Sequence, residues 1–240
     1  MTKLTAAMAS LLAVLPIALY PVSASGQRAA SDACRALADL NLEHTNLLSA
    51  TVVLASDDLP EYCRVVGYVR PAINFEIRLP TSSWNGKFYM AGCGGLCGRV
   101  ESDNPGFVNA INYGLKRNYA VSTTGAGHWG ETWYDGRWAF PNRVAEIDWA
   151  YRASHETARV TKAVIKAFYG QAPERSYFQG CSNGGRMAHM AAIRYPEDFD
   201  GIISGAPALD PQGHLRILLS VDSPGEHRAR RQEPHHTGRG

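Results

Sequence analysis

The chain has 240 residues, of which 45% are hydrophobic, 19% charged and 10% aromatic, and its formal net charge is +2. This balance is typical of a globular protein with one sizeable core, and one folded domain is the natural expectation. Part of the positive charge comes from the arginine-rich stretch 225–240. The charge is too weak and too terminal to indicate a nucleic-acid partner.

The first 24 residues have the layout of a secretory signal peptide. Lys3 supplies a positive start, 6–20 is an apolar stretch, and 22–24 offers small residues at a cleavage point. A retained membrane anchor is the less favoured alternative, because the stretch is short, contains Pro16 and is followed by no second apolar run. We therefore expect a secreted or periplasmic protein without a membrane partner, whose mature chain starts near Ser25.

Export to an oxidising compartment changes how the five cysteines are interpreted. They become disulfide candidates rather than metal ligands, and no Cys/His group has the spacing of a zinc site, so we expect no metal. The cysteines are Cys34, Cys63, Cys93, Cys97 and Cys181. Because five is odd, one sulfur lacks a partner within the chain. That sulfur is either a buried thiol or one whose partner lies in sequence outside this chain.

The elements expected first along the chain are a helix and a β-rich portion. A short helix is predicted over 31–40, with Ser31 or Asp32 as its N-cap. The runs 64–69 and 74–79 carry β-branched and aromatic residues, and we expect them to pair as antiparallel strands. A buried strand over 87–91 then enters a glycine-rich loop at 92–98.

Helices and strands alternate beyond this loop. We expect a helix over 107–116, a strand over 119–123, a loop over 125–130, a helix over 147–168, a strand over 176–178, a helix over 185–194 and a strand over 201–204. Such alternation implies parallel crossovers, and hence an α/β fold. The predicted sheet is mostly parallel, with flanking helices and an N-terminal antiparallel portion. One domain is expected over 25–210, followed by a divergent, disordered tail over 211–240.

The motif that carries chemistry is Gly180-Cys181-Ser182-Asn183-Gly184, which matches G-x-S-x-G between a predicted strand and a predicted helix. Its glycines permit a turn so tight that a β-carbon would collide. The turn presents Ser182 at the carboxyl edge of the sheet as a nucleophile. The alternative is a serine that only caps the helix.

A serine nucleophile also needs donors for the oxyanion. One is the amide N–H of Asn183, and a second is expected from the loop at 92–98, which follows an earlier strand. The alternative for this loop is a plain turn held by a Cys93–Cys97 bridge, which does not exclude the donor role.

No acid or histidine after Ser182 is well placed to complete a catalytic triad. His189 lies about two turns along the helix that starts at the motif, so the rise of the helix carries it away from the serine. The other downstream histidines lie in or beside the unstructured end, where a rigid triad cannot be built. We expect the catalytic Asp and His to be absent from this chain.

Several segments together resemble the tannase/feruloyl esterase family of secreted α/β-hydrolase serine esterases. They are PEYCRV, FEIRLP, WNGKFYMAGCGG, the FYG that ends the long helix, and YFQGCSNGGRMAHMAAIRYPEDFDGIISGAPA. A cysteine directly before the nucleophile, with Gly-Gly-Arg after it, is unusual among hydrolases in general. The resemblance runs from about 34 to 208, and it implies part of an α/β-hydrolase fold.

The resemblance also assigns roles to individual residues. It implies that Ser182 is the catalytic nucleophile, that Asn183 and Gly95 form the oxyanion hole, and that Cys34 pairs with Cys63. Cys181 matches a cysteine that bonds, in the family, to one beside the catalytic histidine, so here Cys181 is expected to be unpaired. The family's lid, often with calcium, and its Asp and His match no segment. We therefore expect no cofactor and a chain truncated or frame-shifted before the lid.

Two functions follow from these observations. The first is a carboxylic ester hydrolase that acts on small aromatic substrates, phenolic esters such as gallates or hydroxycinnamates, through an acyl-enzyme on Ser182. The alternative is a catalytically silent fragment, because without a base the serine keeps little nucleophilicity.

Overall fold

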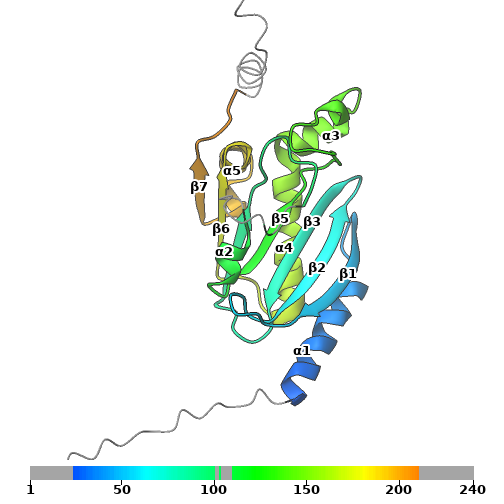
Figure 1. Ribbon diagram of the computed structural model, residues 1–240, viewed down its shortest axis with the longest axis vertical. Coiled ribbons are helices and arrows are strands. Elements are labelled where there is room, and N and C mark those ends of the chain that lie inside the picture. Colours follow the sequence, from blue (N-terminus) through cyan, green and yellow to red (C-terminus); the bar gives the residue numbers. More distant parts are fainter. Residues whose placement is uncertain (1–23, 101–102, 104–109, 211–240) are drawn as a thin grey trace, which may run out of the picture.

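Figure 1 shows a computed structural model of the chain, which describes residues 24–100, 103 and 110–210. These residues form a seven-stranded sheet with helices packed against it. Residues 1–23 of the predicted signal peptide and the whole predicted tail over 211–240 lie outside the described residues. Within the described ranges, no helix combines the length and the apolar character needed to cross a bilayer.

The sheet is mixed. Its strands are β1 (Thr45–Val53), β2 (Tyr62–Val69), β3 (Ile73–Pro80), β4 (Lys87–Ala91), β5 (Ala120–Thr124), β6 (Arg175–Cys181) and β7 (Gly201–Gly205). They lie in the order β1-β2-β3-β5-β4-β6-β7. Three neighbouring pairs are antiparallel, namely β1 with β2, β2 with β3, and β3 with β5. The pairing of β2 with β3 was predicted from the sequence. β5, β4, β6 and β7 are parallel, so their carboxyl ends meet at one edge.

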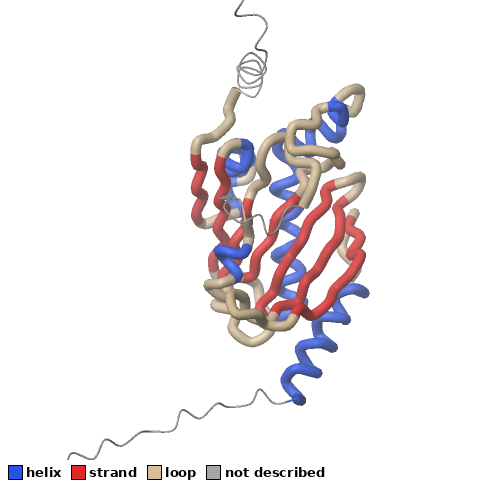
Figure 2. Tube along the Cα trace, viewed as in Figure 1, coloured by secondary structure: helices blue, strands red, loops and turns tan. Residues whose placement is uncertain are grey.

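The helices cover both faces of the sheet, as Figure 2 shows. They are α1 (Ala24–Ala36), α2 (Asn112–Leu115), α3 (Arg143–Ile147), α4 (Ala153–Tyr169) and α5 (Asn183–Arg194), with the π-helical turn η3 (Asp148–Arg152) and the 3-10 turns η1 (Leu37–Asp39), η2 (Arg137–Ala139) and η4 (Pro196–Asp198). Alternation along β4 sorts the core between the faces. Phe88 and Met90 pack in the larger cluster with residues of α4 and α5, whereas Tyr89 packs in a smaller cluster with Leu115 of α2.

Two N-terminal features differ from the predictions. The first helix begins at Ala24, so Ser31 and Asp32 lie inside it and neither is its N-cap. Both residue types favour helix starts, but the helical pattern continues upstream through alanines, which have the highest helix propensity. β1 was not predicted from the sequence. It is an edge strand with mostly partial burial and a register shift between Leu47 and Ser49, so its sequence lacks clean alternation.

Two helices also differ from their predicted extents. The helix expected over 147–168 is instead α3, the π-helical turn η3 and α4, which ends at Gly170 with φ 76° as predicted. Of the helix predicted over 107–116, only Asn112–Leu115 is α-helical in the described part, and 104–109 lie outside it. The π turn coincides with Asp148, which is fully buried. A β-carbon on Gly127 would come within 2.2 Å of the Cβ of Asp148, so the turn packs directly on the loop after β5.

A cavity of about 710 Å³ lies on the face of β6 and β7 opposite α5, as the described residues outline it. It is lined in part by Tyr89, Tyr177 and Ile203. Ile203 is 63% exposed. β7 is also the last strand of the sheet, so among the described residues its outer edge has no neighbouring strand.

Two buried charges lie inside the antiparallel half of the sheet. Glu76 accepts hydrogen bonds from Arg78 at 2.7 Å and from Arg64 at 2.6 Å, and Arg78 also donates to Asp103. Burial alone would raise the pKa of Glu76, but the hydrogen bonds and charges of the two arginines lower it below its usual value. The network therefore keeps Glu76 ionised and joins β2, β3 and Asp103.

We expect Glu76→Ala to lower the free energy of unfolding by about 3 kcal/mol, because it leaves a buried arginine short of one counter-ion while Asp103 still pairs with it. Urea unfolding of the full chain measures this. The control is Arg143→Ala, which removes an exposed pair with Glu146 and should cost less than about 1 kcal/mol. Equal losses in the two variants would contradict the assignment.

Candidate active site

Ser182 lies on a strained turn between β6 and α5. Its backbone has φ 58° and ψ −121°, a combination that residues with a side chain rarely adopt, and the residue is exposed. Three backbone hydrogen bonds hold it there. Its N–H donates to the carbonyl of Gly205, and its carbonyl accepts from the amides of Arg186 and Ala208. The end of β7 therefore helps to fix the serine backbone.

Glycines make this turn sterically possible. A β-carbon on Gly180 would come within 2.1 Å of the carbonyl oxygen of Gly184. One on Gly92 would come within 2.6 Å of the Cα of Gly184, and one on Gly185 within 2.3 Å of the oxygen of Gly205. The first and last glycines of the motif thus touch each other, and the loop after β4 touches both the turn and the start of α5.

The glycine-rich loop at 92–98 lies beside this turn. Gly92 donates to the carbonyl of Gln179 and so extends the pairing of β4 with β6. A disulfide joins Cys93 to Cys97. Gly95 has φ 56°, and a β-carbon there would lie 2.3 Å from the carbonyl oxygen of Trp133, so this position requires glycine. The bridged turn considered from the sequence is present, and it is compatible with a donor role for Gly95.

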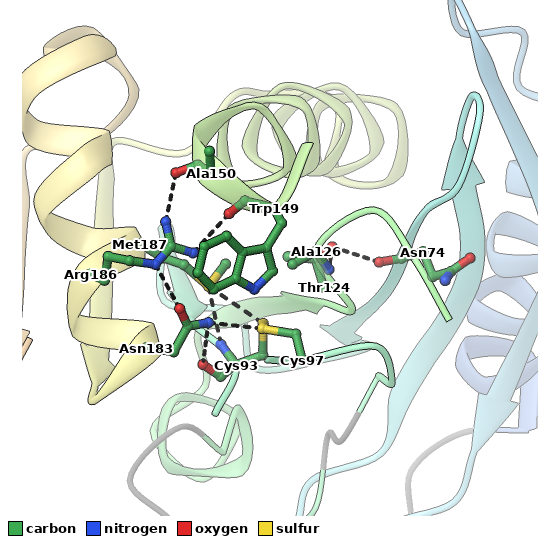
Figure 3. Close-up of a disulfide and its surroundings, with 10 residues drawn as sticks. All are labelled: Asn74, Cys93, Cys97, Thr124, Ala126, Trp149, Ala150, Asn183, Arg186 and Met187. Atoms are coloured by element: carbon green, nitrogen blue, oxygen red, sulfur yellow. Dashed lines mark hydrogen bonds between the residues drawn. A yellow bond between two sulfur atoms is a disulfide. The ribbon is translucent and has the colours of Figure 1, made fainter. Parts of the chain in front are cut away.

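Asn183 connects the turn to this loop (Figure 3). It is buried at the first position of α5, where a main-chain N–H has no acceptor within the helix. Its side-chain Nδ2 lies 3.0 Å from Cys97 Sγ and 3.4 Å from the carbonyl oxygen of Cys93. The structure thus brings Ser182, Asn183 and the loop of Gly95 to the same edge of the sheet.

Arg186 lies one turn further along α5 and is also buried. Its Nε donates to Asn183 Oδ1 at 2.7 Å, and its terminal nitrogens donate to the carbonyls of Ala150 and Trp149 in the π turn η3. Its guanidinium lies 3.7 Å from the centre of the Trp149 ring. Burial lowers the pKa of Arg186 to about 10, so the side chain stays charged at neutral pH. In the sequence this residue is the arginine of the Gly-Gly-Arg run that supports the family resemblance, but no role was assigned to it there.

The cysteines tie other elements together. Cys34 of α1 bonds to Cys63 of β2, as the resemblance implied. Cys181 is the last residue of β6 and is partly exposed beside Ser182.

None of the histidines in the described ranges is hydrogen-bonded to Ser182, so none of them is placed to act as its base. His189 is exposed on α5, seven residues past the serine. His155 of α4 forms a pair with Asp198 at 2.8 Å, which the sequence gave no signal for. Asp198 follows α5, whose 12 residues extend roughly 18 Å at about 1.5 Å per residue. This pair is therefore too far from the turn to act on Ser182.

His128 follows β5 in the loop predicted at 125–130 and is 4% exposed. Its ring stacks on Trp138 with centroids 3.8 Å apart. Burial is the main cause that lowers the pKa of His128, to about 4, so the imidazole is neutral at neutral pH. A β-carbon on Gly98 would come within 3.1 Å of its Nε2, so His128 packs against the end of the glycine-rich loop.

The strand order, the crossover helices and the serine on a strained turn define an α/β-hydrolase fold. The crystal structure of feruloyl esterase B from Aspergillus oryzae superposes with a TM-score of 0.65 and 31% identity, covering 75% of this chain and 38% of that one. The family model for tannase and feruloyl esterase matches residues 56–218. The chain therefore belongs to the tannase and feruloyl esterase family.

The relatives that the chain matches are much longer than the chain. An uncharacterized esterase from Xanthomonas campestris is 39% identical over 193 residues, which are 75% of this chain and 32% of that protein. A probable feruloyl esterase B-2 from Aspergillus flavus is 36% identical over 154 residues, 62% of this chain and 28% of its own length. The chain thus spans about a third of the length of these relatives.

We expect Gly180→Ala to destabilise the fold by more than about 3 kcal/mol, because the new methyl group would overlap backbone that cannot move independently. Gly170→Ala is the control. Gly170 also has a positive φ, but a β-carbon there meets nothing within 4 Å, so only backbone strain of about 1 kcal/mol is expected. Unfolding free energies in urea compare the two, and similar losses would argue against the close packing of the turn.

Acidification should weaken the fold through His128. Its pKa is about 4 in the folded chain against an ordinary 6.5, so between these values the unfolded chain binds more protons. The contribution is fully present above pH 6.5 and is lost as the pH falls towards 4, by at most about 1.4 kcal/mol per pH unit. His128→Phe should flatten this dependence in urea unfolding, while His189→Phe, at an exposed position, should not. Parallel pH profiles for wild type and His128→Phe would contradict the prediction.

Proposed function

We propose that this protein is a carboxylic ester hydrolase that acts on phenolic esters, gallates or hydroxycinnamates, with Ser182 as its nucleophile. The observation that carries the proposal is the exposed Ser182 on a strained turn, with the amide of Asn183 beside it and the glycine-rich loop in contact. The 12-residue helix α5 starts at this point, so the positive end of its dipole faces the reacting atoms.

The proposed reaction has two stages. Ser182 Oγ attacks the ester carbonyl carbon, and the amides of Asn183 and Gly95 donate to the oxyanion. The intermediate then expels the alcohol, which takes up the proton lost by the hydroxyl, and leaves an acyl-enzyme. Water cleaves this ester, releases the carboxylic acid and restores the serine. The proton passes through a general base outside the described residues, and no cofactor takes part.

Aromatic side chains beside the glycine-rich loop support an aromatic substrate. Trp133 lies directly against Gly95, because a β-carbon on Gly95 would come within 2.7 Å of its ring. Trp129, Trp133 and Tyr134 are all exposed. The names of the relatives point the same way, since several are feruloyl esterases. The two disulfides support a secreted or periplasmic location. The proposed partner is a small-molecule substrate, with no membrane or nucleic-acid partner.

A catalytically silent chain is the second candidate. It is favoured by one observation: within the described residues, no histidine or carboxylate is hydrogen-bonded to Ser182. Without a base, a hydrolase keeps only the acceleration that its oxyanion hole and substrate binding provide.

We expect a fluorophosphonate probe to label the full chain at Ser182, with Ser182→Ala abolishing the label and Ser83→Ala, a change at a remote exposed serine, leaving it intact. Turnover of methyl ferulate and methyl gallate is measured on the same samples. Turnover that is lost in Ser182→Ala would exclude the silent chain. Labelling without turnover would support the silent chain, and a folded wild type that is not labelled would refute the nucleophile assignment.

A further inference from the structure

The side chain of Asn183 uses both ends of its carboxamide to join separate parts of the molecule. Its Oδ1 accepts from Arg186 on the same helix, and its Nδ2 faces Cys93 O and Cys97 Sγ of the glycine-rich loop. The residue is 3% exposed, so these contacts form away from solvent. In such surroundings hydrogen bonds are strong and directional, and an unpaired partner is costly.

Arg186 fixes the orientation of this carboxamide. A primary amide can be turned by half a rotation, but a guanidinium only donates, so the group facing Arg186 Nε must be the oxygen. The nitrogen then necessarily faces the loop. Arg186 is itself held by the carbonyls of Trp149 and Ala150 and by the ring of Trp149, all from η3.

The loop segment that Asn183 contacts, residues 93–97, is closed into a short ring by a disulfide. Cys93 and Cys97 are bridged, and the amides of Leu96 and Cys97 are hydrogen-bonded to Trp133 and Gly94. Gly95 lies at the centre of this ring. The contacts from Asn183 Nδ2 to Cys93 O and Cys97 Sγ therefore add to the packing of Gly92 on Gly184 in holding this loop segment against α5.

We propose that the side chains of Asn183 and Arg186 form a latch that holds the bridged loop against the start of α5 and keeps the amides of Asn183 and Gly95 aimed at one point. Asn183 would then serve the oxyanion twice, through its main-chain donor and through its side chain. Arg186 is a positioning residue that acts through Asn183. The proposal rests on the proposed function, since that function requires both amides.

The test compares three variants of the full chain with a matched control. Asn183→Ala removes the side-chain contacts to Cys93 and Cys97, and Arg186→Gln removes the guanidinium that orients the carboxamide of Asn183. Asn183→Asp is the decisive variant: a carboxylate pairs well with Arg186 but cannot donate to the loop. The control is Arg194→Gln, an exposed arginine of the same helix that stacks 4.1 Å from the ring of Tyr151 in η3 without touching the loop.

Two quantities are measured at a temperature well below each melting transition. We expect the rate constant for fluorophosphonate labelling of Ser182 to fall about tenfold or more in all three variants. Hydrogen exchange at the amides of Leu96, Cys97 and Gly98 should accelerate in the same variants. Arg194→Gln should stay within twofold, roughly, on both measures.

The melting temperature separates positioning from simple stability. Asn183→Asp should melt at or above the wild-type temperature, because the buried guanidinium gains a counter-ion, and still label slowly. A purely structural role would make the labelling rate follow the melting temperature, and that result would overturn the proposal. Unchanged exchange at the loop amides, or unchanged labelling in Asn183→Ala and Asn183→Asp, would overturn it as well.

Failure of the proposed function would look different. If the folded wild type is not labelled at all, the nucleophile assignment falls, while hydrogen exchange alone still decides whether Asn183 and Arg186 hold the loop. Faster exchange in the variants would support the latch, and unchanged exchange would refute it.

Discussion

The close approach of three backbone segments around Ser182 is the constraint on which the rest of the structure depends. Gly180 and Gly92 lie so near the backbone of Gly184 that neither can carry a side chain without displacing main chain. This packing forces the chain to reverse within one residue, which gives Ser182 its positive φ. The exposure of Ser182, the start of α5 and the contact with the bridged loop all accompany that sharp turn.

The features that local sequence determines could be predicted, and those that depend on distant contacts could not. G-x-S-x-G marked the turn, and alternation or apolar runs marked β2 to β7, because each signal lies within a few neighbouring residues. β1 was missed, since an edge strand with partial burial has a weak pattern. The π turn at Asp148 packs on Gly127 in the loop after β5, and Arg186 of α5 contacts the same turn. These elements are far apart along the chain, so residue spacing does not reveal their contacts.

The fold buries arginine in two different ways. Arg78 lies among carboxylates, so its charge is balanced and its network joins strands of the antiparallel half. Arg186 has only neutral acceptors in the described structure, two carbonyls and one amide, together with an indole ring. Carbonyl dipoles offset less of the desolvation cost than a carboxylate would. A guanidinium held in this manner stays a strong donor towards Asn183, which a carboxylate neighbour would weaken.

The outer edge of β7 has a consequence for association between chains. Among the described residues this edge has no neighbouring strand, and it lies next to tyrosines and an exposed isoleucine, so it is a template on which a second chain can add by pairing main chain to main chain. Such growth is favoured by concentration and is not opposed by the modest net charge of +2. Low protein concentration, or a partner strand paired with this edge, would therefore favour a single chain with its serine turn accessible.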